Sequence, residues 1–191
     1  MQRVGINGFG RMGRLGLRAA WGSGELEFVQ INEIAGDAAC AAHLLKFDSI
    51  HGVFGPDCRA EGERVVVDDK AMVFTSNAAI GETDWSGCDI VIESSGSFRK
   101  PEQLQVYFDQ GVKKVVVAAP VVGALNIVYG INDHLYDPAE HRLLTAASCT
   151  TNCLAPVVKV MHERIGLPSA KTVQEPQTPI PHPNFDPVRA R

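Results

Sequence analysis

The N-terminal segment places a glycine-rich turn between a short apolar stretch and an amphipathic one. Residues 3–7 are mostly apolar, residues 11–21 carry apolar side chains at helical spacing, and Gly8, Gly10 and Gly13 form the pattern G-x-G-x-x-G. A strand, such a turn and a helix in that order are typical of dinucleotide-binding units. The first glycine permits the tight turn, the second lets a pyrophosphate approach the backbone, and the third lets helix and strand pack closely. A plain tight turn is the alternative interpretation.

Strand-like and helix-like segments alternate along most of the chain. The segments with strand patterns are 26–31, 64–67, 71–74, 89–93, 114–118, 127–131 and 143–147. Those with helix patterns are 37–45, 101–110 and about 149–165. Alternation of this kind favours βαβ units around a parallel sheet. We therefore predict an α/β fold of the Rossmann type, doubly wound around a mostly parallel sheet, with a hairpin formed by 64–67 and 71–74.

The helix after the glycine turn and the end of the second strand suit the two halves of a nucleotide. A helix N-terminus presents free backbone N–H groups to an anion, so we expect the amides of Arg11 and Met12, beside Phe9, to bind the pyrophosphate. Glu33 lies 20 residues beyond Gly13. An acidic residue there accepts hydrogen bonds from the adenosine ribose and repels a 2′-phosphate, which favours NAD over NADP. For Glu33 alone, a solvated strand end is the alternative.

Cys149 follows a predicted strand and opens the last predicted helix. Backbone N–H groups at a helix N-terminus favour the thiolate, which is the nucleophilic form of cysteine. The hydroxyls of Ser148 and Thr150 flank it and can either hold an anionic substrate or cap the helix. A buried structural thiol is the alternative for Cys149. We expect Cys153, one turn along the helix, to contribute to packing rather than chemistry.

Composition excludes several classes of protein. The net charge is −4, the pI is about 5.8, and no run of basic residues is present, which argues against a general nucleic-acid binder. No stretch approaches the roughly 18–20 apolar residues that span a bilayer. The N-terminus does not have the pattern of a signal peptide, so a cytoplasmic location is the default expectation. Five cysteines at wide spacing predict neither a disulfide framework nor a metal site.

Five segments of the chain, in order and spacing, resemble the phosphorylating glyceraldehyde-3-phosphate dehydrogenases. They are GINGFGRMGR, KFDSIHG, ESSGSF, KKVVVAAP and ASCTTNCLAPVVKVMHE. The resemblance covers about residues 1–167. It implies an NAD-binding Rossmann domain over 1–148 and the nucleophile helix of a catalytic domain over 149–167. Variants at 31–34, 42–45 and 132–138 resemble the subgroup that accompanies an arsenic-efflux permease.

The resemblance also implies an activity and further site residues. The Cys149 thiolate would add to glyceraldehyde 3-phosphate, hydride would pass to NAD, and inorganic phosphate, or arsenate in the arsenic-linked subgroup, would release the product. By position Ser148 and Thr150 would bind substrate or the attacking anion. The residues implied near the cofactor are Ser95, Gly96, Asn77 (at the adenine) and Ala118 (near the nicotinamide). Family members are homotetramers.

Three departures from the family pattern stand out. Glu33 replaces an aspartate, Ser95 replaces a threonine, and Ala118 stands where a serine is frequent. Residues 168–191 hold six of the eleven prolines and lack the family's catalytic histidine and second domain. We therefore expect a C-terminally truncated member with a Pro-rich, unrelated tail. The histidine in that tail, His182, has no framework to hold it at Cys149. A catalytically inert NAD-binding fragment and an unstable truncation product remain as alternatives.

Overall fold

The computed structural model describes residues 1–166. Its helices are α1 (Arg11–Ala20), α2 (Ala38–Lys46), α3 (Pro101–Asp109) and α4 (Cys149–Ile165), with 3₁₀ turns η1 (Ile80–Glu82) and η2 (Asp133–Leu135). Its strands are β1 (Gln2–Asn7), β2 (Leu26–Asn32), β3 (Phe47–Asp48), β4 (Gly52–Val53), β5 (Cys58–Ala60), β6 (Arg64–Val67), β7 (Lys70–Thr75), β8 (Ile90–Glu93), β9 (Lys114–Val117), β10 (Leu125–Asn126) and β11 (Leu143–Thr145).

The chain divides into two compact units, Met1–Pro156 and Val157–Arg191, and all the strands named above belong to the first. The division expected from the sequence, at residues 148 and 167, stays a prediction, and the predicted tail 168–191 lies outside the described residues. None of the helices within 1–166 combines the length and the apolar character needed to cross a membrane.

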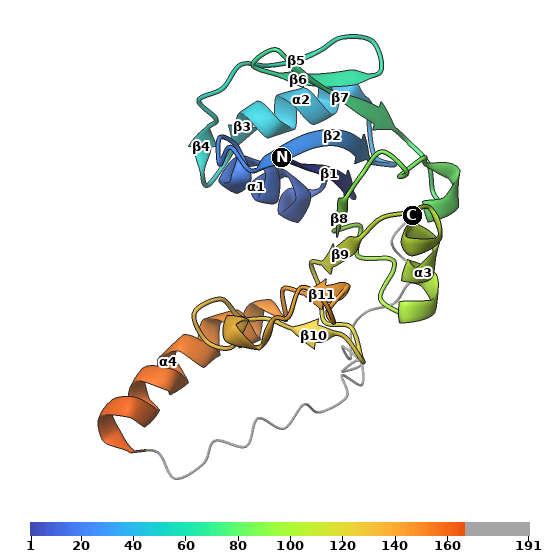
Figure 1. Cartoon of the computed structure of the whole chain (residues 1–191). Coiled ribbons are helices and arrows are strands. Elements are labelled where there is room, and N and C mark those ends of the chain that lie inside the picture. The colour runs from blue at the N-terminus through green and yellow to red at the C-terminus, as the bar shows by residue number, and fades with distance from the viewer. Residues whose placement is uncertain (167–191) are drawn as a thin grey trace, which may run out of the picture. The chain divides into compact units, whose positions relative to one another are not determined.

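One nine-stranded sheet organises the first unit, in the order β10-β11-β9-β8-β1-β2-β7-β6-β5, which Figure 1 follows from β7 through β2 and β1 to β8 and β9. The six pairs from β10 to β7 are parallel, and only the pairs of β6 with β5 and β7 are antiparallel. β1 therefore lies between two strands that are reached by crossovers in opposite directions. This arrangement confirms the predicted α/β fold of Rossmann type around a mostly parallel sheet.

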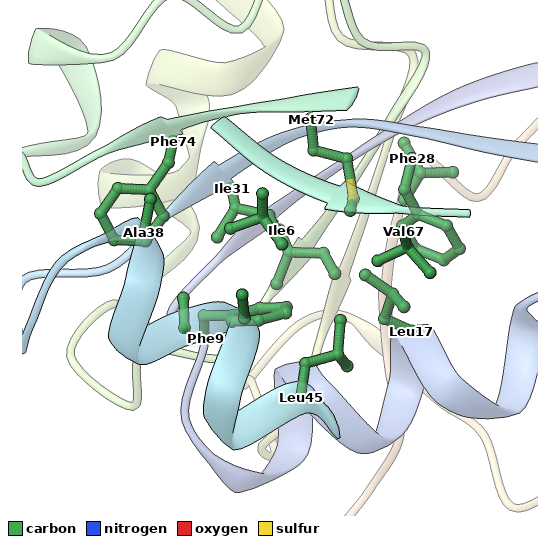
Figure 2. Packing of buried hydrophobic residues seen from close by; sticks show 14 residues of the cluster. Ile6, Phe9, Leu17, Phe28, Ile31, Ala38, Leu45, Val67, Met72 and Phe74 are labelled. Atoms are coloured by element: carbon green, nitrogen blue, oxygen red, sulfur yellow. The ribbon is translucent and has the colours of Figure 1, made fainter. Parts of the chain in front are cut away.

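Two hydrophobic cores cover the two faces of the sheet. The first packs α1 and α2 against strands β1, β2, β6 and β7, and Figure 2 shows Leu17 from α1 and Leu45 from α2 pointing at Ile6, Met72 and Val67. The second packs α3 and the Ile80–Cys88 segment against β8 and β9. β8 separates them by simple alternation, since Ile90 and Ile92 pack on the first core and Val91 belongs to the second. Helices on both faces are what double winding requires.

Helices α2 and α3 begin at local sequence signals, close to the predicted positions. The Asp37 carboxylate accepts the Cys40 N–H at 2.8 Å and caps α2. Pro101 opens α3, where its missing N–H costs nothing. The predicted hairpin is also confirmed as β6 and β7, and Asp68 in its turn has φ of +42°.

The predicted strand at 127–131 is wrong. The chain forms a turn there, because the Asn132 side chain accepts the Val128 N–H at 2.7 Å and donates to the Asn126 carbonyl at 2.9 Å. Side-chain bonds of this kind compete with a sheet ladder for the same backbone groups. The strand predicted at 143–147 ends at Thr145, because Ala147 has φ of +55°. Sequence patterns also missed the short strands β3, β4 and β5.

The first core predicts a contrast between two neighbouring leucines on α2. Leu45 is fully buried, whereas Leu44 is 39% exposed. Leu45→Ala should lower the free energy of unfolding by about 2–5 kcal/mol, since it leaves a cavity under the sheet. Leu44→Ala should change it by about 0.5 kcal/mol or less. Urea denaturation followed by circular dichroism measures both, and equal losses would show that α2 does not pack as described.

Candidate cofactor site and nucleophile

Three loops leave the carboxyl ends of adjacent parallel strands and meet at the point where the strand order reverses. The glycine turn follows β1, Glu33 follows β2, and the turn at 94–96 follows β8. In open α/β sheets ligands bind in the crevice at such a switch point. The residues predicted for the cofactor from the sequence therefore fall on the edge where the fold itself favours a site.

The three glycines of the turn have different tasks. Gly8 has φ of +86°, and a Cβ there would lie 2.3 Å from the Ser95 backbone nitrogen. A Cβ at Gly13 would lie 2.3 Å from the Gly8 carbonyl oxygen. At Gly10, by contrast, no atom lies within 4 Å of the added Cβ. Gly8 and Gly13 are thus required by packing, and Gly10 leaves an open cradle at the N-terminus of α1 that suits a pyrophosphate.

Glu33 lies at one side of this cradle and is half-buried. Its carboxylate accepts the Phe9 N–H at 2.7 Å through Oε2 and the Ala35 N–H at 2.9 Å through Oε1. A cleft of about 210 Å³ opens beside it, lined by Phe9, Gly10, Arg14, Glu33, Ala35, Cys40, Ala41 and Leu44. The longer glutamate therefore braces the glycine turn while each oxygen keeps acceptor capacity. The Phe9 ring lies in the core, so only the backbone of this residue is open to a ligand.

A second cleft, of about 160 Å³, lies on the β8 and β9 side of the turn. Its lining residues are Met12, Glu93, Ser94, Gly96, Phe98, Arg99, Val117, Ala118 and Ala119. Met12, Gly96 and Ala118 were all predicted from the sequence. Together the two clefts hold most of the predicted cofactor residues, on opposite sides of one anion cradle. This is the arrangement an extended dinucleotide needs, so the residues fit NAD.

Asn77 and Arg11 lie at this edge of the sheet but outside the residues that line the two clefts. The Asn77 side chain donates to the Glu82 carbonyl at 2.9 Å and to the Thr83 hydroxyl at 3.0 Å. The exposed Arg11 guanidinium pairs with Asp48 at 3.3 Å. The backbone N–H of Arg11 belongs to the first turn of α1, where it has no helical acceptor. The predicted roles of Asn77 at the adenine and of the Arg11 amide at the pyrophosphate stay predictions.

A buried polar row underlies the three loops, and sequence reasoning missed it. The Asn7 Nδ2 donates to Glu93 Oε2 at 2.8 Å, and the Asn32 Nδ2 donates to Asn7 Oδ1 at 2.8 Å. Thr75 Oγ1 donates to Asn32 Oδ1 at 2.9 Å. These four residues end β1, β8, β2 and β7 in register. The signal available in the sequence was that each of these apolar strands ends in a polar residue.

Tyr107 of α3 completes this row. Its O–H donates to Glu93 Oε2 at 2.6 Å, and its ring packs edge-on against Trp85. Burial, and then the neighbouring Glu93 charge, raise the pKa of Tyr107 well above its usual value. Tyr107 therefore stays a neutral donor, which is the form that a buried carboxylate requires.

Cys149 is the first residue of α4 and is exposed, so the buried-thiol alternative is wrong for it. Ser148 caps the helix, because its Oγ accepts the Thr151 N–H at 3.1 Å. The Thr150 hydroxyl lies 2.9 Å from Ser148 Oγ. The buried thiol of the chain is Cys88, where burial raises the pKa to about 11. Cys153 is also exposed, which contradicts the prediction that it contributes to packing.

The strand that precedes Cys149 is paired with a strand whose end lines the second cleft. β11 pairs in parallel with β9, with Thr145 opposite Val117, and the Ala146 N–H donates to the Val117 carbonyl at 3.0 Å. The segment before Cys149 thus leaves the sheet beside Val117 and Ala118, which line that cleft. Cys149 itself is not among the residues that line that cleft, so the predicted reaction of its thiol beside a bound dinucleotide stays a prediction.

The glycine turn predicts opposite effects for two alanine substitutions. Gly8→Ala forces a Cβ into the Ser95 backbone at positive φ, so it should cost more than about 1–3 kcal/mol of stability. Gly10→Ala should stay within about 1 kcal/mol of the parent, yet weaken NAD binding at least about tenfold because its methyl group fills the cradle. Thermal unfolding and titration calorimetry separate the two effects. A Gly10→Ala chain that binds NAD like the parent would rule out the cradle.

Comparison with known proteins agrees with this site. The model of the family described as "Glyceraldehyde 3-phosphate dehydrogenase, NAD binding domain" matches residues 2–101. Glyceraldehyde-3-phosphate dehydrogenase 3 of Nostoc sp. is 57% identical, over 99% of this chain and 58% of its own length. Glyceraldehyde-3-phosphate dehydrogenase of Geobacillus stearothermophilus is 42% identical, over 86% of this chain and 50% of its own. Glyceraldehyde-3-phosphate dehydrogenase 1 of Streptomyces arenae is 44% identical, over 87% and 51%.

The chain thus spans about half the length of these relatives, or slightly more. The Nostoc alignment also reaches into 168–191, because it covers 99% of the chain. The family model covers the glycine turn, Glu33 and the 94–96 turn, which are the three loops of the switch point. By this match, the chain belongs to the glyceraldehyde-3-phosphate dehydrogenase family and carries that family's NAD-binding domain.

Proposed function

We propose that this chain is the cofactor-binding and nucleophile-bearing part of an NAD-dependent glyceraldehyde-3-phosphate dehydrogenase. The observation that carries the proposal is the exposed Cys149 at the start of α4, which follows β11, the strand paired with β9, whose end lines the second cleft. A dinucleotide cradle and a helix-terminal thiol at the carboxyl ends of strands in one parallel sheet are the two parts that oxidation of an aldehyde through a thioester requires.

The covalent steps follow from the position of Cys149. Its thiolate adds to the aldehyde carbon and forms a hemithioacetal. NAD, when bound, supplies the hydride acceptor. Loss of hydride from the carbon, and of the hydroxyl proton to solvent, would leave a thioester on Cys149, which an oxygen of inorganic phosphate would attack. The thiolate then leaves, and the product is an acyl phosphate. Arsenate would give the arsenylated product in the same way.

The hydroxyls of Ser148 and Thr150 are proposed to meet the substrate or the attacking anion. Ser148 Oγ lies 2.9 Å from Thr150 Oγ1 and 2.7 Å from Thr151 Oγ1, so three hydroxyls gather beside Cys149. Because Ser148 also caps α4, an anion here would meet hydroxyl groups and a helix N-terminus together. The proposal keeps both phosphate and arsenate as the attacking anion, with arsenate linked to an arsenic-resistance role.

The remaining features of the proposal concern setting and partners. We propose a cytoplasmic enzyme that acts on small molecules, without nucleic-acid or membrane partners, in keeping with its net charge of −4. The expected assembly is a homotetramer. For these points the resemblance to the family is the support, together with the composition of the chain.

A second candidate is an NAD-binding module without turnover. Within residues 1–166 the hydrogen bonds of His51 and His141 go to Asp48 and Asp137 rather than to Cys149. Loss of acid–base catalysis alone costs roughly 10²–10⁴-fold in rate. This observation favours the module for the polypeptide tested in isolation.

One assay separates the two candidates. The chain is mixed with NAD, glyceraldehyde 3-phosphate and either phosphate or arsenate, and NADH is followed at 340 nm. The proposed enzyme gives turnover that Cys149→Ser abolishes and that the matched Cys153→Ser, one helical turn away, retains. NAD binding without Cys149-dependent turnover establishes the module instead. Turnover that survives Cys149→Ser would contradict the thioester route.

A further inference from the structure

Glu93 is the most deeply buried acidic side chain among residues 1–166, with 1% of its surface exposed. It ends β8 and lies opposite Asn7 of β1 and Val117 of β9 in the parallel register. A carboxylate in such a place is stable only when its oxygens are hydrogen-bonded. In the described part of the chain no lysine or arginine forms an ion pair with it. Neutral hydrogen-bond donors must therefore stabilise the Glu93 carboxylate.

The donors divide between the two carboxylate oxygens. Oε2 accepts the Asn7 Nδ2–H at 2.8 Å and the Tyr107 O–H at 2.6 Å. Oε1 accepts the Ser95 backbone N–H at 2.8 Å and the Ser95 hydroxyl at 2.5 Å. One oxygen is thus tied to the sheet and α3, and the other holds a single exposed residue. All four groups can donate, which matches the acceptor-only ionised carboxylate.

Ser95 links Glu93 to the edge of the sheet where the cofactor is proposed to bind. Its backbone nitrogen lies 2.3 Å from where a Cβ of Gly8 would be, so the 94–96 turn rests directly on the glycine turn. The neighbouring Ser94 hydroxyl donates to the Gly8 carbonyl at 2.6 Å. Ser94 and Gly96 line the second cleft, with Gly96 at φ of +77°. A shift of Ser95 would therefore change the wall of that cleft.

A shift of Ser95 should affect the binding of only one half of the cofactor. Glu93 lines the second cleft, whereas neither it nor Ser95 lines the cleft beside Glu33. The Glu33 cleft is the adenosine side in the proposed function, because an acidic residue there meets the ribose. The second cleft, beside Ala118 and the segment that leads to Cys149, is then the nicotinamide side.

We propose that Glu93 is a positioning residue for the nicotinamide half of the cofactor, acting through the two hydrogen bonds that hold Ser95. This inference rests on the proposed NAD-binding function and adds to it a residue that does not itself react. Glutamine at position 93 has nearly the same shape, but its amide nitrogen cannot accept hydrogen bonds. Turned toward Asn7, that nitrogen would leave the buried Asn7 Nδ2–H without its acceptor, so we expect it to turn toward the exposed Ser95, whose backbone N–H then loses its acceptor.

Calorimetric titration with NAD and with ADP-ribose, which lacks the nicotinamide, tests the inference without any need for turnover. In Glu93→Gln the affinity for NAD should fall about tenfold or more, since hydrogen bonds to a charged group are lost. The affinity for ADP-ribose should stay within about twofold, because the Glu33 cleft and the Gly10 cradle are unchanged. The ratio of the two affinities is the readout, and a general loss of structure would not move it selectively.

Two further variants help to interpret the ratio of the NAD and ADP-ribose affinities. Ser95→Ala removes the hydroxyl bond to Glu93 on the exposed turn, together with the bond that the hydroxyl accepts from the Ser97 N–H at 3.2 Å. It tests the same link even if Glu93→Gln does not fold. It should lower NAD affinity more than ADP-ribose affinity. Tyr107→Phe is the matched control: it removes the hydroxyl that donates to the other carboxylate oxygen and accepts the Asn7 Nδ2–H at 2.7 Å. It should lower the melting temperature while leaving the ratio unchanged.

The outcomes are distinguishable. If Glu93→Gln and Ser95→Ala weaken both ligands equally, or neither, the positioning role is wrong and NAD binding by the parent still stands. If Tyr107→Phe shifts the ratio as strongly as Glu93→Gln, the effect is a general loosening of the core and the inference is overturned. A folded parent chain that binds neither ligand would overturn the proposed function, and this inference with it.

Discussion

A row of side-chain hydrogen bonds across the carboxyl ends of the parallel strands fixes where the loops of the proposed site leave the sheet. Asn7 lies at its centre, donating to Glu93 at 2.8 Å and accepting from Asn32 at 2.8 Å. Buried polar groups are costly unless they are satisfied, so a fully bonded row fixes one register and one set of strand ends. The loops after β1, β2 and β8 therefore leave the sheet from fixed positions, and residues of these three loops line part of the two clefts.

The residues of the proposed site follow one another along this edge of the sheet. Glu33 after β2 braces the glycine turn through the Phe9 N–H, and Gly10 leaves the cradle open. The 94–96 turn and Ala118 form the next cleft, and β11 then delivers Cys149 at the capped start of α4. In the proposed site the backbone N–H groups at the start of α1 would bind the pyrophosphate, so the cradle would need no cationic side chain.

Periodicity and turn chemistry in the sequence were enough to predict the parallel sheet, the glycine turn and the helix start at Cys149, because these are local signals. Side-chain competition for the backbone was not visible. Asn132 turns the chain where an apolar run predicted a strand, and Ala147 ends β11 early at positive φ. The Glu93–Ser95 link was missed for a different reason. Its strength comes from burial and from Tyr107 on another element, neither of which a single sequence displays.

The central claim is that these residues form a working NAD site on a Rossmann sheet. Titration calorimetry of the purified chain with NAD, and in parallel with NADP, tests it most directly. The account predicts saturable binding of one NAD per chain, with NADP weaker because Glu33 repels a 2′-phosphate. A chain with a folded circular dichroism spectrum that shows no saturable NAD binding, or that prefers NADP, would contradict it.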